Sequence, residues 1–294
     1  MSLKKKILFL INPISGIGQK NIIPKLIEKY IDSKTYEFLI KNTEYRKHGH
    51  EIALVEKENF DIIVAIGGDG TVNEIGSALI GSDTALGIIP TGSGNGLARH
   101  LNVPLKIKNA LKTINKGKTK TIDTGLVNEH QFLGTCGFGF DAYIAKKFDE
   151  YHKRGFLSYA KLIKQEFKRY KPLTYRITKN GKSETKTSLM YCVANSSQFG
   201  NGFTISPDSK ITDGKFEHVF LEDFKAKNIL LMGTQFFNKR INRSQFYSSF
   251  STNEPVNVEI LEHDKCTFHI DGEPMECMNT FEIKIVPASL NIIC

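Results

Sequence analysis

The segment 61–74, with the sequence DIIVAIGGDGTVNE, limits the possible folds more than any other part of the chain. Residues 61–66 have the apolar character of a buried strand, and the glycine-rich residues 67–71 follow them directly. Helical spacing resumes over residues 73–80. A buried strand that leads through a glycine loop into a helix is one βα unit, and such units require a sheet covered by helices.

The same alternation extends over the first ~125 residues, as expected for one α/β domain. Strands are predicted at 6–11, 36–40, 61–66 and 85–89, and helices at 19–31, 50–57 and 73–80. This order predicts a parallel sheet with right-handed crossovers. In such sheets ligands bind beyond the carboxyl ends of the strands, where the glycine loops of this chain fall.

From about residue 121 the pattern changes to short strands, which predicts a second, largely antiparallel domain. A hairpin is expected from 121–127 and 131–136, helical spacing covers 140–170, and Asn180-Gly181 is a hairpin turn signal. Further strands are predicted at 174–178, 189–194, 216–221, 256–260, 267–270 and 281–286. The predicted domains are 1–125 and 126–284, with a last strand at about 285–294 that can return to the first domain.

Length and composition suit this division. A chain of 294 residues is long enough for two domains with a core each. No apolar run approaches the ~18 residues needed to cross a bilayer, and the N-terminal run is too short for a signal peptide. The five cysteines form no CxxC pair, so a cytoplasmic protein is expected.

The positive charge is concentrated in one segment. The whole chain has 40 Lys and Arg against 31 Asp and Glu, and residues 146–186 hold thirteen of the basic residues but four acidic ones. Such a surface attracts phospholipid head groups, nucleic acid or polyphosphate. The alternative is a solvated face of a lysine-rich protein.

Three loops offer backbone amides to a phosphate: 12–16 (NPISG), 67–71 (GGDGT) and 91–96 (TGSGNG). Glycines let the backbone approach a ligand, and the amides that open the following helix favour an anion. Asp69 would repel that anion unless a cation such as Mg²⁺ accompanies it, or it contacts a ligand hydroxyl. Alternatively, this is a plain strand-to-helix turn in which Asp69 binds only backbone. Neither a P-loop nor a Rossmann motif is present.

The set NPISG (12–16), GGDGTVNE (67–74) and PTGSGNGLARHL (90–101) resembles the diacylglycerol kinase catalytic-domain superfamily, which includes bacterial soluble lipid kinases, sphingosine kinases and ceramide kinases. The resemblance continues through 137–148, 195–217 and HIDGEP (269–274), so it spans nearly the whole chain. It implies a nucleotide-binding α/β domain, a β-rich second domain and an active site in the cleft between them.

The resemblance also implies roles for individual residues. Glu273 matches the proton acceptor, with Asp271 and Asp69 as further catalytic candidates. The implied ATP-binding residues are Asn12, Pro13, Ser15, Gly16, Thr43, Gly67, Gly68, Asp69, Gly70, Thr71, Asn73, Gly92 and Ser93. The turn at Asp213 matches a structural Mg²⁺ loop whose ligands would be the Asp213 carboxylate and the main-chain carbonyls of Lys210 and Lys215. A plain β-turn is the alternative for that loop.

The function expected from these features is ATP- and Mg²⁺-dependent phosphorylation of a lipid hydroxyl, by a cytoplasmic protein that docks on anionic membranes through residues 146–186. The alternatives are a soluble-substrate kinase such as an NAD kinase, and a non-catalytic lipid- or nucleotide-binding module. Nucleic acid is not an expected partner, because the basic segment contains no recognisable nucleic-acid-binding motif. The particular lipid and the oligomeric state, a homodimer included, stay open.

Overall fold

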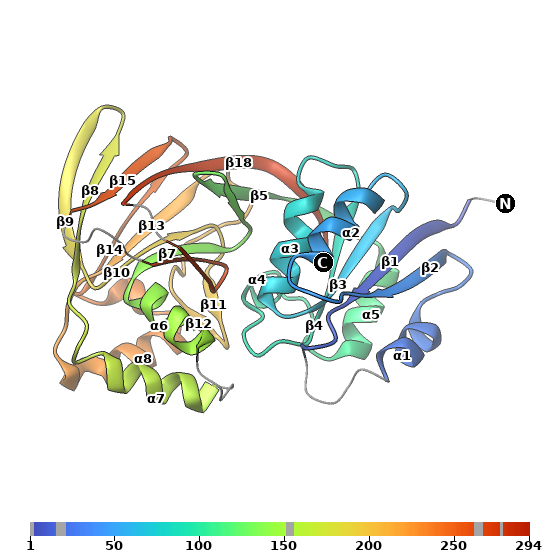
Figure 1. Ribbon diagram of the computed structural model, residues 1–294, viewed down its shortest axis with the longest axis horizontal. Helices are drawn as coiled ribbons and strands as arrows, with labels where there is room; N and C mark the ends of the chain where they lie inside the picture. The colour runs from blue at the N-terminus through green and yellow to red at the C-terminus, as the bar shows by residue number, and fades with distance from the viewer. Residues whose placement is uncertain (1–2, 16–21, 151–155, 262–266, 277–278) are drawn as a thin grey trace. The chain divides into compact units, whose positions relative to one another are not determined.

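The computed structural model describes residues 3–15, 22–150, 156–261, 267–276 and 279–294 (Figure 1). The chain forms two compact units: an N-terminal unit of Met1–Asp123 and Ala288–Cys294, and a C-terminal unit of Thr124–Pro287. The boundaries predicted from the sequence lie within a few residues of these.

The N-terminal unit alternates strands and helices as predicted. Its elements are β1 (Lys5–Ile11), α1 (Ile23–Tyr30), β2 (Tyr36–Asn42), α2 (His48–Glu56), β3 (Ile62–Gly67), α3 (Asp69–Leu79), β4 (Ala85–Pro90), α4 (Gly96–His100), α5 (Ile107–Lys116) and parts of β5 (Thr119–Val127) and β18 (Thr280–Ile293). Helix α3 begins at Asp69 rather than at residue 73, so the glycine motif itself forms the first helical turn.

The strands of the N-terminal unit form a parallel sheet in the order β2-β1-β3-β4-β18, in which Ile292 of β18 pairs with Leu86 of β4. Helices α1 and α5 pack on one face through a cluster that includes Phe9, Ile27 and Leu111. Helix α3 contacts β3 and β4 on the other face, with α2 against it (Figure 1). This confirms the predicted parallel sheet, with both faces covered.

The C-terminal unit is rich in antiparallel strands. Its strands are β6 (His130–Phe132), β7 (Thr135–Gly139), β8 (Leu173–Lys179), β9 (Lys182–Ser188), β10 (Met190–Ala194), β11 (Gln198–Gly200), β12 (Phe203–Thr204), β13 (Phe216–Leu221), β14 (Tyr247–Thr252), β15 (Val256–Ile260), β16 (Phe268–Ile270) and β17 (Glu273–Met275). Its helices are α6 (Phe140–Asp149), α7 (Phe156–Glu166) and α8 (Ile229–Phe237), with 3₁₀ turns at Ala226–Asn228 and Ile241–Arg243.

Two layers of strands enclose the core of this unit. One layer has the order β18-β15-β8-β9 and the other β14-β13-β10-β7-β16-β17. Phe281 of β18 meets Phe138 of β7 across the core, with ring centroids 4.7 Å apart. Helices α6, α7 and α8 share a second apolar cluster with β10 and β13. The unit is therefore a β-sandwich with helices packed on one of its sheets.

One sequence prediction for this unit was wrong in detail. The expected hairpin strand 131–136 is divided, because β6 pairs with β5 whereas β7 joins the other sheet. Three successive amides, at Leu133, Gly134 and Thr135, donate to the Asp271 carboxylate, so they are not available to continue the β5–β6 ladder. The helical spacing over 140–170 is confirmed, and it corresponds to two helices, α6 and α7.

Candidate functional site

The three glycine-rich loops of the N-terminal unit meet at the carboxyl edge of its sheet, because they follow the adjacent strands β1, β3 and β4. Backbone hydrogen bonds hold them together there. The amide of Asn12 donates to the carbonyl of Ile66 (3.0 Å), and the amides of Thr91 and Gly92 donate to the carbonyl of Gly67 (2.8 and 3.3 Å). The predicted convergence of these loops is confirmed.

Side chains of the first loop connect it to the other two. Asn12 donates from Nδ2 to Thr71 Oγ1 (2.9 Å), while its Oδ1 accepts from the amide of Ile14 (3.0 Å). The hydroxyls of Ser15 and Thr91 are hydrogen bonded at 3.2 Å. Asn12, Ser15 and Thr71 therefore fix the shape of the rim of loops. Thr91 was not among the predicted site residues, although it belongs to the motif at residues 90–101.

Two glycines are required by close approach at this rim. A Cβ on Gly67 would lie 2.3 Å from Thr71 Oγ1, and a Cβ on Gly92 would lie 2.5 Å from the Cα of Gly68. The loops after β3 and β4 are thus in backbone contact. Helix α3 begins beside this contact without a side-chain cap, and the first amides of a helix have no partner within the helix. The rim is suited to bind an anion such as a phosphate.

Asp69 links two of the loops. Its Oδ2 accepts from the amide of Asn95 (2.8 Å) and its Oδ1 from the amide of Gly96 (2.7 Å), at the start of α4. Asn95, in the left-handed conformation (φ 54°), also donates from Nδ2 to the carbonyl of Gly92 (2.7 Å). The sequence motif contained Asn95, but nothing in it indicated this role. The predicted role of Asp69 toward Mg²⁺ or substrate stays a prediction.

The remaining predicted ATP-binding residues have varied positions. Thr43 is buried at the end of β2, where its amide donates to the carbonyl of Ile11 (2.9 Å), and Ser93 is exposed at the tip of its loop. Pro13 lies in the loop after β1, and Gly70 and Asn73 lie near the start of α3. Gly16 lies outside the described residues. Nucleotide contact by each of these residues stays a prediction.

In the C-terminal unit, the second motif forms the turn between β16 and β17. Asp271 (φ 50°) and Gly272 (φ 86°) both have positive φ, the conformation of a type I′ hairpin turn. The Asp271 carboxylate accepts from the amides of Leu133, Gly134 and Thr135 at 2.9, 2.7 and 2.8 Å. These bonds give Asp271 a role in holding the hairpin against the β6–β7 loop; its predicted role in the chemistry stays a prediction.

A buried pair supports the hairpin from inside. The amide of Gly272 donates to Nδ1 of His269 (3.3 Å), so Nε2 carries the proton and donates to Asp141 Oδ2 (3.0 Å). Both side chains are buried, and the other oxygen of Asp141 has no partner within the described residues. Glu273, which opens β17 and is half-buried, follows this turn directly. This pair was not predicted from the sequence, since 128 residues separate its members.

Buried thiols lie close to this pair. Burial first, and the charge of Asp141 in addition, raise the pKa of Cys136 and of Cys192 well above the ordinary value of a thiol. These cysteines therefore stay protonated and pack as small apolar side chains.

The predicted structural Mg²⁺ loop is an exposed turn. The Asp213 carboxylate accepts from the amide of Lys215 (3.2 Å), and Gly214 has a positive φ of 69°. Among the described residues there is no group of three His, Cys, Asp or Glu side chains that could hold a metal ion. These contacts account for a turn, and binding of Mg²⁺ by Asp213 and the carbonyls of Lys210 and Lys215 stays a prediction.

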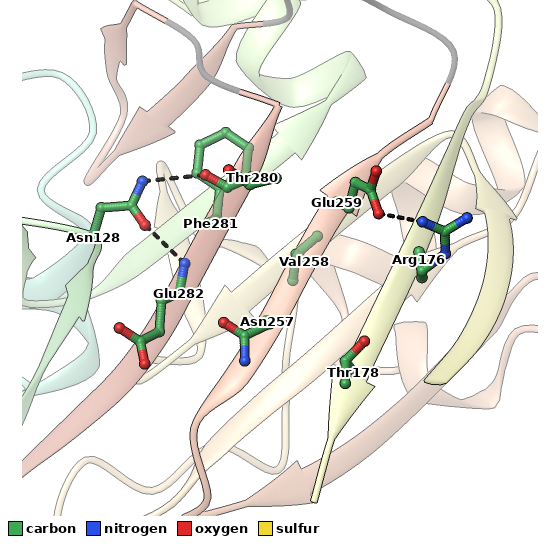
Figure 2. Close-up of a pocket in the computed structure, with 9 residues that line it drawn as sticks. All are labelled: Asn128, Arg176, Thr178, Asn257, Val258, Glu259, Thr280, Phe281 and Glu282. Atoms are coloured by element: carbon green, nitrogen blue, oxygen red, sulfur yellow. Dashed lines mark hydrogen bonds and ion pairs between the residues drawn. The ribbon is translucent and has the colours of Figure 1, made fainter. Parts of the chain in front are cut away.

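A hollow of about 320 Å³ lies on the outer side of strands β8, β15 and β18 (Figure 2). It contains none of the predicted site residues. Its polar groups largely bind one another: Arg176 pairs with Glu259, and Asn128 bonds to the carbonyl of Thr280 (3.3 Å) and the amide of Glu282 (2.8 Å). We therefore assign no site to this hollow.

Comparison with known proteins yields matches along the chain. The family model "Diacylglycerol kinase catalytic domain" matches residues 6–127, and "YegS C-terminal NAD kinase beta sandwich-like domain" matches residues 134–294. A protein named "Diacylglycerol kinase" from Mycobacterium tuberculosis is 27% identical over 302 residues, covering 98% of this chain and 94% of that protein. A "Probable lipid kinase YegS-like" from Yersinia enterocolitica is 30% identical over 237 residues, covering 78% and 77%.

The fold has solved counterparts. A crystal structure described as a diacylglycerol kinase from Bacillus anthracis matches with a TM-score of 0.76 and 20% identity, and it covers 100% of this chain and 98% of that one. At this identity the likeness establishes the fold alone. It agrees with the two units observed, each with the architecture predicted from the sequence.

Proposed function

This chain belongs to the family of diacylglycerol kinases and YegS-like lipid kinases, and on that basis we propose that it transfers the γ-phosphoryl group of ATP to the hydroxyl of a lipid, either diacylglycerol or a sphingoid-type lipid. The observation that carries the proposal is the rim of three loops, which are joined by hydrogen bonds and closed by a glycine contact that leaves no room for a Cβ.

In this proposal the N-terminal unit holds the nucleotide. The amides at the start of α3 and around Gly92 and Ser93 donate to phosphate oxygens, and Asn12, Ser15 and Thr71 keep the rim in shape. The proposed nucleotide-binding set is completed by Pro13, Gly16, Thr43, Gly67, Gly68, Gly70 and Asn73. Mg²⁺ bound with the nucleotide would neutralise phosphate charge, and a carboxylate such as that of Asp69, at the rim, is a ligand type that Mg²⁺ prefers. A second Mg²⁺ at Asp213 with the carbonyls of Lys210 and Lys215 would stabilise that turn.

Glu273 is the proposed general base. Its carboxylate takes the proton from the lipid hydroxyl as the hydroxyl oxygen forms its bond to the γ-phosphorus, and the bond from that phosphorus to the bridging oxygen breaks, which releases ADP. Asp271, His269 and Asp141 hold the turn that leads into Glu273, so the carboxylate is carried by a supported hairpin.

The lipid acceptor implies contact with a membrane, and residues 146–186 are proposed to supply it. In this segment Lys161, Lys164, Lys168 and Arg169 are exposed on and just after α7. Anionic lipid strengthens binding by about 1 kcal/mol for each such cation. No helix among the described residues is long and apolar enough to span a bilayer. Added salt is therefore expected to lower activity on anionic vesicles, and unchanged activity up to about half-molar salt would count against this docking.

The test offers labelled ATP together with diacylglycerol, a sphingoid base or NAD. The proposal expects label in a lipid, and transfer mainly to NAD would establish the soluble-substrate alternative. Glu273→Gln is expected to lower turnover about 10²–10⁴-fold without changing thermal stability, because the base is lost but the fold is kept. The control is Glu276→Gln, in an exposed residue just after β17. Equal turnover by wild type and Glu273→Gln would contradict the assignment of the base, and no transfer by wild type to any acceptor would favour a non-catalytic module.

A further inference from the structure

Helix α8 presents large apolar side chains to solvent. Leu230 is 80% exposed, Leu231 53% and Phe237 46%, although the helix has only nine residues. On its opposite side Met232 and Phe236 are buried. Phe236 is therefore part of the core, whereas the half-exposed Phe237 meets the ring of Phe203 edge-on, with ring centroids 5.7 Å apart.

The exposed residues are held on a firm base. Met232 and Phe236 belong to the same apolar cluster as Leu162 and Phe167, which lie on and just after α7. Leu230, Thr234 and Phe237 recur at helical spacing, and Leu231 lies beside Leu230, so the exposed stripe carries three large apolar side chains and one threonine. The stripe is therefore a stable feature of the surface rather than a frayed end.

Basic residues flank this stripe in the sequence. Five basic residues before and after α8 are exposed: Lys225, Lys227, Lys239, Arg240 and Arg243. The segment 225–243 contains no aspartate or glutamate. Glu222 and Asp223 precede the segment, but even with them the charge from 222 to 243 is positive. An apolar stripe with basic flanks is the pattern of a helix that lies in the interface of an anionic membrane.

We propose that α8 is the apolar anchor by which this protein docks on an anionic bilayer, with Leu230, Leu231 and Phe237 entering the boundary between head groups and acyl chains. This rests on the proposed function, in which the acceptor is a membrane lipid, and it names the surface that reaches that lipid.

The charge favours a bilayer over the other possible occupants of this face. A symmetric dimer through α8 would bring five cations of one copy against the same five of the other, which is unfavourable. Anionic lipid head groups neutralise those cations, and the acyl boundary accepts the leucines. The exposed cations of α7, whose cluster α8 shares, add to the same attraction.

The absence of tryptophan from the chain gives a direct test. Leu230→Trp places a single tryptophan on the stripe of the full-length protein. Its emission is expected to shift to the blue with vesicles of phosphatidylglycerol and phosphatidylcholine in equal parts, and to be quenched when the acyl chains are brominated. Val55→Trp is the matched control, since Val55 is 73% exposed on α2, next to Glu56 and Lys57. No shift for Leu230→Trp, or an equal shift for Val55→Trp, would overturn the proposal.

Co-sedimentation with the same vesicles measures the strength of binding. Leu230→Ser with Leu231→Ser is expected to weaken binding by roughly tenfold to a hundredfold, because two leucines that would be buried in the bilayer are lost. Leu54→Ser with Val55→Ser should leave binding unchanged. Unchanged vesicle binding by Leu230→Ser with Leu231→Ser would overturn the proposal. So would a wild-type dimer that this double variant, but not the control, dissociates while its binding to vesicles is unaltered. Kinase activity on detergent-dispersed lipid is a separate readout, so failure of the anchor is distinguishable from failure of the proposed function.

Discussion

Gly92→Ala is the sharpest test of the rim of loops, because one methyl group would enter the contact that joins two of them. The added Cβ would lie 2.5 Å from the Cα of Gly68 and 3.1 Å from Asn95 Oδ1. Carbon atoms in contact prefer about 3.5–4.0 Å, so the two loops must separate by about 1 Å. The atom in the way belongs to the backbone, and no side-chain rotation can relieve the clash.

This separation affects both stability and ligand binding. Overpacking of this kind costs about 1–3 kcal/mol of unfolding free energy. It also lengthens the bond from the Gly92 amide to the carbonyl of Gly67, now 3.3 Å, beyond hydrogen-bond distance. A displacement of about 1 Å in groups that position a substrate can lower the rate about 10²-fold, so a loss of that order in kcat/KM for ATP is expected.

Two glycine variants serve as controls, with kinetics and denaturant unfolding measured on all three proteins. Gly87→Ala places its Cβ 2.7 Å from Ile114 Cδ1 and 2.9 Å from Val64 Cγ2, so it should destabilise the core but keep the KM for ATP. Gly68→Ala meets its nearest neighbour at 3.4 Å and should fold with near wild-type stability. Wild-type kinetics for Gly92→Ala, or an equal kinetic loss in Gly87→Ala, would refute the role of the glycine contact in shaping the nucleotide site.

Two further predictions concern buried histidines. His269→Phe should lower the unfolding free energy by about 3–5 kcal/mol, because Asp141 loses its buried partner. The double variant with Asp141→Leu, measured by urea unfolding and by kinetics, should regain stability but not turnover. Recovery of both stability and turnover would mean that the pair does not position Glu273. For His218, burial first and then the charge of Lys179 lower the pKa from 6.5 to about 3. Between these two pH values the unfolded chain binds a proton at this histidine that the folded chain does not, so the stability it contributes is complete above about pH 6.5 and falls toward pH 3. His218→Phe should weaken this pH dependence of the unfolding free energy in denaturant titrations at several pH values. An unchanged slope of unfolding free energy against pH would contradict the prediction.

The parallel sheet and its glycine loops could be predicted from sequence because their signals are local. Apolar runs define the buried strands, and the residues after them mark where each chain segment leaves the sheet. Once β1, β3 and β4 are parallel neighbours, their loops must emerge at one edge, and the structure confirms this. The Asn180-Gly181 turn was predictable for the same reason, since positive φ at both positions favours these residue types.

What required the tertiary structure is the set of contacts between distant segments. The Asp271 carboxylate receives amides from residues 133–135, and His269 meets Asp141, so in both cases the partners are more than a hundred residues apart. The exposed stripe of α8 was equally invisible, because an apolar helix gives the same pattern whether its second face is covered or bare. Local spacing determines which residues form a strand, a turn or a helix face. Which other residues reach them depends on how the strands are ordered and packed, and residue spacing carries no record of that.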